Sequence, residues 1–309
     1  MDLLPDSRST ARRRESSATN LESPRRAQVC AQARSTKMTV TGLTDDRIAR
    51  PRTPMGILRS FINSQIWLSK HFDRLLPDEF HIDGNSTFSR EFTPPFLAPG
   101  LKVYDLGGGM SPHISPQTKR ALQLVVVGVD ISAEELRNAP VGAYDEMVCC
   151  DVATLHGAAD ADLVICRAVL EHVQDVEGAF RAVASMLKPG GRALIFVPSR
   201  NAVFARLNLL LPQGIKRWLL YKIFPQTRSG QGFPSYYHLC TPRDFRRLAE
   251  THALRVERLD TYYVSSYFSF FFPLYLLWRL WLLIFRACAG EQAAESFAVV
   301  LRSEQTLVR

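Results

Sequence analysis

The sequence lacks several patterns that would settle its class at once. None of its six cysteines forms a C-x-x-C pair, and most stand inside apolar runs such as Met147–Cys150. Neither a disulfide framework nor a zinc site is expected, and scattered reduced thiols are typical of a cytosolic protein. No carboxylate and histidine residues converge at ligand spacing, so we expect no metal. The first residues have no apolar run, so we expect no secretory signal peptide.

The net charge is small outside the first 54 residues. The formal net charge is +8, and most of it lies in residues 1–54, which are rich in Arg, Ser and Thr and have no apolar periodicity. Such a segment buries too little surface to offset chain entropy, so we expect a disordered basic tail there. Residues 55–309 are nearly neutral, which argues against a nucleic-acid partner.

Strands and helices alternate in residues 55–309. An amphipathic helix is predicted over about 55–76, followed by a Pro-rich linker at 93–100. Nearly continuous apolar runs indicate parallel strands that are buried on both faces. The predicted strands are Leu101–Leu106, Leu124–Asp130, Glu146–Val152, Ala161–Arg167, Arg192–Pro198, Leu254–Val264 and Glu295–Ser303. This order predicts an α/β fold, a doubly wound, seven-stranded and mostly parallel sheet with an antiparallel last strand and apolar helical inserts.

A glycine-rich turn follows the first predicted strand. The chain reads Asp105, then Gly107, Gly108 and Gly109, and the second strand ends in Asp130. Glycines allow a tight turn and close approach to a ligand, and an acid ending the second strand can accept hydrogen bonds from both hydroxyls of a ribose. These residues predict a cofactor that contains a nucleoside.

More motifs follow in a fixed order. Cys150–Val152 comes after the third strand, Glu171–Val173 after the fourth, and Leu187–Gly191 before the fifth. With the glycine turn, they make residues 88–303 resemble the class I S-adenosylmethionine-dependent methyltransferases of the "LEHV…LKPGG" branch. The resemblance implies a Rossmann-like methyltransferase fold, S-adenosylmethionine as cofactor and transfer of a methyl group. One departure is Ser111, where the family's turn usually has its last glycine.

The resemblance also implies roles for particular residues around the cofactor. They are Asp105, Gly107 and Gly109 at the aminocarboxypropyl end, Asp130 at the ribose, Ile131 on the adenine, Asp151 and Val152 at the adenine amino edge, and Arg167 closing the site. The alternatives are a helix cap or turn former for Asp105 and a solvated strand end for Asp151.

Catalysis of methyl transfer depends mainly on alignment of the acceptor, and an oxygen acceptor also needs a general base. His172 and His238 are the candidate bases, because imidazole titrates near neutral pH. The alternative is that His172 orients its loop and His238 is a surface residue. Oxygen, nitrogen and carbon acceptors remain open, with oxygen favoured.

Two other functional classes compete with the methyltransferase. A nicotinamide oxidoreductase would want a G-x-G-x-x-G turn and commonly a Tyr-x-x-x-Lys pair, whereas this turn reads GGGMSP and no Tyr has a Lys four residues later. A catalytically silent, membrane-associated scaffold would keep the fold, but it would have no physical need for the Asp105–Asp130 set.

Two apolar inserts point to a membrane surface. Tyr262–Phe285 carries one charge, Arg279, and is long enough to cross a bilayer. The last two strands should pair as a hairpin, which puts both ends of insert 265–290 on one side and favours an in-plane anchor. Trp278, Trp281, Arg279 and Arg286 are then expected at the headgroup layer. The alternative is that the insert caps the core or forms a dimer interface.

The other insert, 203–238, is expected to cover the acceptor, with Lys216, Arg217, Trp218 and Lys222 beside Leu-rich faces. The expected acceptor is a small-molecule, lipid-linked or glycan compound near the membrane. The expected location is cytoplasmic, peripheral or monotopic on the membrane.

Overall fold

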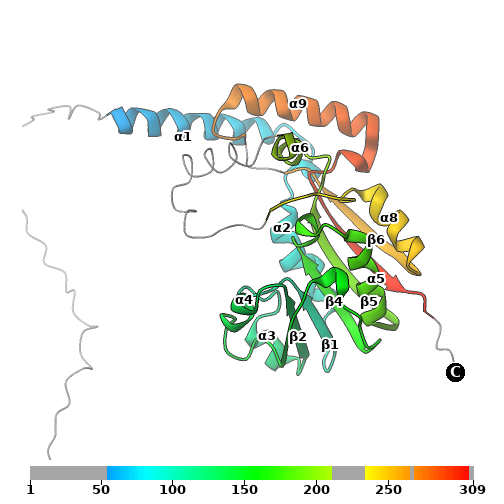
Figure 1. Cartoon of the computed structure of the whole chain (residues 1–309). Helices are drawn as coiled ribbons and strands as arrows, with labels where there is room; N and C mark the ends of the chain where they lie inside the picture. Colours follow the sequence, from blue (N-terminus) through cyan, green and yellow to red (C-terminus); the bar gives the residue numbers. More distant parts are fainter. Residues whose placement is uncertain (1–53, 211–233, 265–267, 306–309) are drawn as a thin grey trace, which may run out of the picture. The chain divides into compact units, whose positions relative to one another are not determined.

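The structure is a computed structural model that describes residues 54–210, 234–264 and 268–305 (Figure 1). Two of the expectations fall outside these ranges. They are the basic tail, over residues 1–53, and the part of insert 203–238 that contains Lys216, Arg217, Trp218 and Lys222.

A seven-stranded sheet forms the centre of the described chain, in the order β3-β2-β1-β4-β5-β7-β6. Strands β1 to β5 are parallel, and β7 lies antiparallel between β5 and β6. The strands are β1 (Lys102–Leu106), β2 (Val125–Asp130), β3 (Glu146–Cys149), β4 (Ala161–Arg167), β5 (Leu187–Pro198), β6 (Leu254–Tyr262) and β7 (Ser296–Ser303). The predicted fold class is confirmed.

The strand order places a ligand site at one edge of this sheet. The chain runs outward from β1 to β2 and β3, then crosses back to β4 on the other side of β1. In open α/β sheets, ligands bind at the carboxyl ends of the strands where the order reverses in this way. The ends of β1, β2 and β4 therefore meet where the glycine turn and Asp130 were expected to act.

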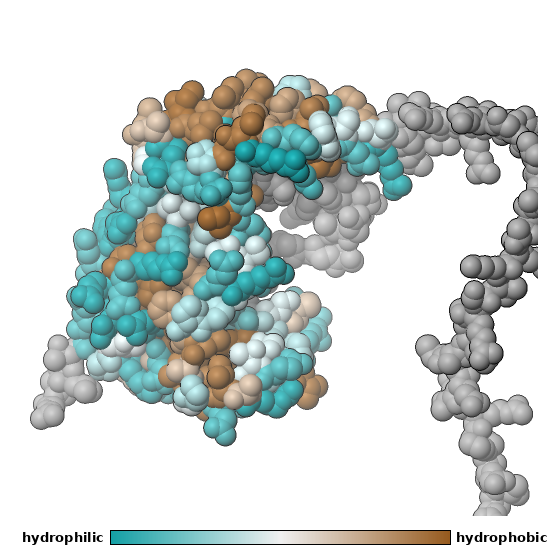
Figure 2. All heavy atoms as spheres, turned by 180° about the vertical axis from the view of Figure 1, so that it is seen from behind, coloured by the Kyte–Doolittle hydropathy of each residue, from teal (hydrophilic) through white to brown (hydrophobic). Residues whose placement is uncertain are grey.

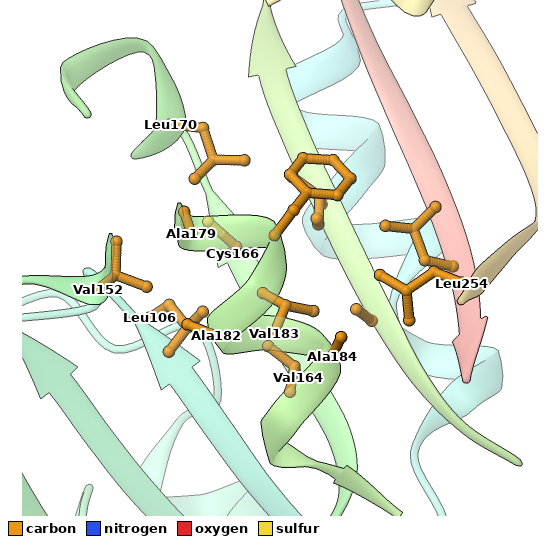
Figure 3. Packing of buried hydrophobic residues seen from close by; sticks show 14 of the residues in the cluster. Leu106, Val152, Val164, Cys166, Leu170, Ala179, Ala182, Val183, Ala184 and Leu254 are labelled. Carbon is orange, nitrogen blue, oxygen red and sulfur yellow. The ribbon is translucent and has the colours of Figure 1, made fainter. Parts of the chain in front are cut away.

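Helices cover both faces of the sheet because the central strands are apolar on both sides. On one face, α5 packs over Leu106, Val164 and Cys166 (Figure 3), and Phe245 and Leu248 of α8 belong to the same buried cluster. On the other, Phe88 and Phe92 pack with Leu136 of α4. The α-helices are α1 (Pro54–Asp73), α2 (Gly84–Thr87), α3 (Pro116–Ala121), α4 (Ala133–Arg137), α5 (Val176–Met186), α6 (Val203–Leu210), α8 (Pro242–Thr251) and α9 (Phe272–Ala289).

Two local expectations differ from the structure. The third strand ends at Cys149 instead of Val152, because the Asp151 carboxylate accepts the Ala153 N–H and starts the 3₁₀ turn η4 (Val152–Thr154). The supposed linker is a packed segment: the turns η2 (Phe88–Phe92) and η3 (Pro94–Phe96) follow α2, and Thr93 is buried. Aromatic residues four apart hold this segment on the sheet.

Helix α9 lies in the connection between β6 and β7. Tyr262 of β6 pairs with Ser296 of β7, so this connection leaves and returns at the same end of the strand pair, as expected. Within the described ranges, Phe272–Ala293 is the one helical stretch long and apolar enough to cross a bilayer, and only 22% of its apolar 18-residue window is buried. It is therefore not an ordinary core helix.

The orientation of α9 corrects one expectation. Arg279 and Trp278 were expected at a lipid headgroup layer, but they point inward and are 1% and 4% exposed. They pack with Tyr275 and Leu282 in a cluster that includes Phe80. The reason is that Arg279 finds a carboxylate partner, Asp73 at the end of α1. Trp281, in contrast, is exposed.

Candidate functional site

The glycine turn and the end of β2 come together at the reversal of strand order. Gly107 and Gly109 have φ values of 70° and 45°, in the left-handed region that favours glycine. A Cβ on Gly107 would stand 2.3 Å from Val169, and one on Gly109 would stand 3.0 Å from an Asp130 carboxylate oxygen. Both glycines are therefore required by close approach, and the turn ends beside Asp130.

Asp105 lies buried beneath this turn. Its carboxylate accepts the main-chain N–H of His113 at 2.7 Å and the Tyr144 hydroxyl at 3.5 Å. Burial raises the pKa of Asp105 to about 6, although these hydrogen bonds and Arg167 act in the opposite direction. The structure assigns Asp105 to the inside of the site and not to an exposed turn.

Three comparisons bear on what this arrangement is. Residues 104–195 match the profile of a family described as a methyltransferase domain. The chain is also similar to proteins named ubiquinone biosynthesis O-methyltransferase. The one from Rhizobium johnstonii is 32% identical, over 43% of this chain and 55% of its own length. The one from Bartonella bacilliformis is 29% identical, over 52% of this chain and 64% of its own length. The chain spans about half the length of such relatives.

Among solved structures, the chain resembles a phosphoethanolamine N-methyltransferase of Haemonchus contortus with S-adenosylmethionine, at 15% identity and a TM-score of 0.45 over 80% of this chain and 60% of that one. Residues 104–195 therefore carry a methyltransferase domain, and the ordered motifs around them predict that it is of the class I, S-adenosylmethionine-dependent kind. Its cofactor is S-adenosylmethionine.

The residues of this methyltransferase domain fit that cofactor. The half-buried Asp130 holds one carboxylate oxygen on the Ser132 N–H at 2.8 Å, and its other oxygen lies toward Gly109. A carboxylate at this place suits ribose hydroxyls. Next to it, Ile131 is 61% exposed, an apolar surface that an adenine could cover. S-adenosylmethionine supplies an activated methyl group on a sulfonium, and the protein's part is to hold and align.

The remaining predicted cofactor residues lie around the same edge of the sheet. Asp151 is exposed and caps η4, and the side chain of Val152 is buried in the core, so only its main chain is available to a ligand. Arg167 ends β4 and donates to the Ser89 hydroxyl at 2.9 Å. Its charge also lowers the pKa of the nearby Asp105. These contacts leave the assigned ligand roles as predictions.

Sequence reasoning missed the residues that support the glycine turn. Tyr144 donates to the carbonyl of Gly109 at 3.1 Å as well as to Asp105. His113 bonds Thr93 through Nε2 at 3.0 Å, and burial, with Arg167 beside it, lowers its pKa to about 4. No sequence motif marks Tyr144 or His113. The one available signal was the four-residue spacing of Phe88, Phe92 and Phe96.

The two candidate bases lie on segments that are joined to each other. His172 ends the 3₁₀ turn η5 (Leu170–His172), and its Nδ1 lies 3.0 Å from the Pro234 carbonyl. His238 is exposed, with Nδ1 3.2 Å from the Gln174 carbonyl. Both imidazoles thus join the loop after β4 to residues 234–238. For His172 this agrees with the alternative that it orients its loop. In that hydrogen-bonding arrangement, Nε2 is the basic nitrogen of each ring.

Glu171, immediately before His172 in the sequence, is a buried acid of the same loop. Its main-chain carbonyl accepts the N–H groups of Tyr236 and Tyr237 at 2.7 and 3.0 Å. Its side chain is buried, and one carboxylate oxygen has no hydrogen-bond partner. Burial raises the pKa of Glu171 to about 8. The loop therefore carries a carboxyl group that favours its neutral form.

Glu171→Gln is expected to change how stability depends on pH. Unfolded Glu171 ionises near pH 4.5 and folded Glu171 near pH 8, so the wild type loses stability as pH rises through this window. Glutamine has no such loss. At about 1.4 kcal/mol per pKa unit, the variant should gain roughly 2 kcal/mol or more over wild type between pH 5 and pH 8.5. Urea unfolding at both pH values measures this.

Glu250→Gln, at an exposed position of α8, is the matched control. Its unfolding free energy should follow that of the wild type at both pH values. The same pH response in the two variants would contradict the assignment of a neutral, buried Glu171.

Proposed function

We propose that the protein is an S-adenosylmethionine-dependent O-methyltransferase whose acceptor is an amphiphilic, lipid-linked compound at a membrane surface. The observation that carries the methyl-transfer part is the meeting of the Gly107–Gly109 turn with Asp130 at the strand reversal. Oxygen as the acceptor atom is supported by relatives named as O-methyltransferases. Because those relatives match over part of their length, the activity of the whole chain rests on this proposal.

His172 is the favoured general base in this proposal. An acceptor hydroxyl must lose its proton as the methyl group is transferred, and an imidazole in reach of the site can take it. His172 lies in the turn that follows β4 at the carboxyl end of the sheet, whereas His238 is exposed and contacts the same loop through the Gln174 carbonyl. The Pro234 carbonyl fixes the His172 ring by its Nδ1, and Nε2 then accepts the proton.

The outward face of α9 supports the membrane part of the proposal. The helix differs from a soluble surface helix: Arg279 is buried, Arg286 is half-buried beside Glu79, and the exposed large side chains are apolar (Figure 2). These exposed residues on and just before α9 are Phe270, Phe271, Leu274, Leu277, Leu280, Trp281 and Ile284. A contiguous exposed apolar surface marks a membrane or partner site, and Trp suits the headgroup boundary. Because β6 and β7 pair at both ends of the connection, α9 lies in the interface without crossing.

Supplying methyl-labelled S-adenosylmethionine to a membrane extract with the purified protein tests this function. We expect label in a lipid-soluble fraction and its release as methoxy groups on chemical cleavage. His172→Gln should lower the turnover number about a hundredfold or more while leaving the KM for the cofactor near the wild-type value.

His238→Gln is the matched control for the base, since it removes an imidazole from the same loop. A large fall in turnover for His238→Gln, with little for His172→Gln, would exchange the two roles. Label confined to nitrogen or carbon atoms would overturn O-methylation, and absence of label from every lipid fraction would overturn the lipid-linked acceptor.

A further inference from the structure

A basic cleft lies at the end of α1, away from the cofactor turn. It is lined by Lys70, Asp73, Arg74, Phe80, His81 and Val264, and its volume is about 200 Å³. That is several times the volume of a water molecule. Basic side chains therefore line an open site of ligand size that the methyl-transfer reaction does not use.

The single lining carboxylate is already neutralised from inside the protein. Asp73 accepts the Arg279 guanidinium at 2.9 Å and the Tyr275 hydroxyl, and its main-chain carbonyl contacts His81 Nε2. Arg279 is 1% exposed, so its charge interacts with Asp73 and does not face the cleft. In the described ranges neither Lys70 nor Arg74 has an ion-pair partner. The cleft is therefore positively charged toward solvent.

Exposed apolar residues stand directly beside these cations. Leu75 follows Arg74 and is 79% exposed, and Ile82 follows His81 and is 43% exposed. Trp67, also exposed, stacks on His71, and His71 contacts Arg74 at 3.4 Å. A positive cleft with an apolar and aromatic rim complements an anion that is attached to a hydrocarbon chain.

The same end of α1 is joined to α9. The Ser69 hydroxyl donates to the Ser269 carbonyl at 3.1 Å, and the Gln65 side chain accepts the Phe272 N–H at 3.1 Å. The apolar outward face of α9 and the cleft thus belong to one packed pair of helices. Figure 1 shows this pair, α1 and α9, side by side. Asp73, which lines the cleft, is bonded directly to Tyr275 and Arg279 of α9, so the cleft adjoins this helix.

We propose that this cleft binds the phosphate group of an anionic phospholipid headgroup while the outward side chains of α9 enter the apolar layer. The inference rests on the membrane association proposed above, and it adds a defined headgroup site with Lys70 and Arg74 as its main cations. The charge of Arg279, buried behind Asp73, makes this site possible.

Flotation of the full chain with vesicles tests the proposal. One set is phosphatidylcholine and the other is phosphatidylcholine mixed with phosphatidylglycerol. The wild type should bind both and prefer the anionic set. Lys70→Ala/Arg74→Ala should reduce binding to the anionic set about thirtyfold, from two cations near the surface, and reduce binding to phosphatidylcholine vesicles far less, because choline offsets the phosphate charge there. Circular dichroism melting verifies that the variant is folded.

Two matched variants separate the cleft from other causes. Arg120→Ala/Arg243→Ala removes two exposed cations on α3 and just inside α8 and should leave the anionic preference unchanged. Leu277→Ser/Trp281→Ser should weaken binding to both vesicle sets by the same factor, since it removes apolar contacts only. An equal loss of anionic preference in the Arg120/Arg243 variant, or none in the Lys70/Arg74 variant, would overturn the headgroup site and leave membrane association standing.

Failure of the wild type to bind any vesicle would instead overturn membrane association and the lipid site together. Calorimetry with soluble glycerol phosphate then distinguishes the source of the anion. Binding of glycerol phosphate that depends on Lys70 and Arg74, without vesicle binding, would replace the lipid by a free phosphate compound. In either case the labelling experiment still reports on methyl transfer by itself.

Discussion

Asp130→Ala should reduce the affinity for S-adenosylhomocysteine, the demethylated cofactor, by about a hundredfold or more. A carboxylate that accepts two hydroxyl groups contributes roughly 1.5–3 kcal/mol for each hydrogen bond, and alanine removes both. The turn at Gly109 lies against this carboxylate, so the loss also leaves a gap beside the loop. Isothermal titration calorimetry measures the change directly and needs no knowledge of the acceptor.

The control is Ser132→Ala. The Ser132 hydroxyl accepts the Glu135 N–H at 3.2 Å and caps α4, the helix that follows Asp130. Its removal costs about 1 kcal/mol of stability but leaves the carboxylate in place. Binding should therefore stay within a few-fold of wild type. A variant of Asp130 that binds the cofactor as tightly as wild type would remove the ribose role from this residue.

The strands and the cofactor turn were predictable from sequence because each follows from local chemistry. An uninterrupted apolar run such as Val125–Val129 has no polar face to expose, so it must be buried on both sides of a sheet. A glycine turn followed by an acid at the end of the next strand indicates a ligand that contains a nucleoside. Neither inference needs a long-range contact.

The support of the site was not predictable in the same way. Tyr144 and His113 meet Asp105 only because the chain returns to it, and their local sequences read as ordinary turns. Residues 93–100 were predicted to be a linker because they are rich in proline, although the segment just before them packs Phe88 and Phe92 on the sheet face. Tertiary packing brings such residues together, and the hydrophobic periodicity of the sequence does not reveal it.

Arg279 shows the same limit on a larger scale. A single charge in an apolar helix reads equally well as a headgroup contact or a buried ion pair. The partner that decides between them, Asp73, lies 206 residues away. The sequence predicted Trp278 and Trp281 at the same headgroup layer, whereas the packing of α1 against α9 buries Trp278 and leaves Trp281 exposed.

Arg279→Met should be the most destabilising substitution in the α1–α9 pair. The guanidinium donates to Asp73, to the Tyr263 carbonyl at 2.8 Å and to the Phe80 carbonyl at 3.2 Å, and it lies 4.6 Å from the Trp278 ring centre. Methionine leaves those oxygens without their donor. Removing one member of a buried pair costs about 3–5 kcal/mol, and the partial exposure of Asp73, 24%, favours the lower end.

Urea unfolding followed by circular dichroism measures this loss, and limited proteolysis of residues 265–295 reports whether α9 opens before the sheet. Arg258→Met is the matched control, because Arg258 pairs with Asp260 but is half exposed, so its loss should cost less than about 1 kcal/mol. Asp73→Asn/Arg279→Met should recover part of the stability, since no unpaired carboxylate remains. Equal losses for Arg279→Met and Arg258→Met would contradict a buried ion pair, and early cleavage confined to α9 would show that Arg279 fastens this helix to the methyltransferase domain.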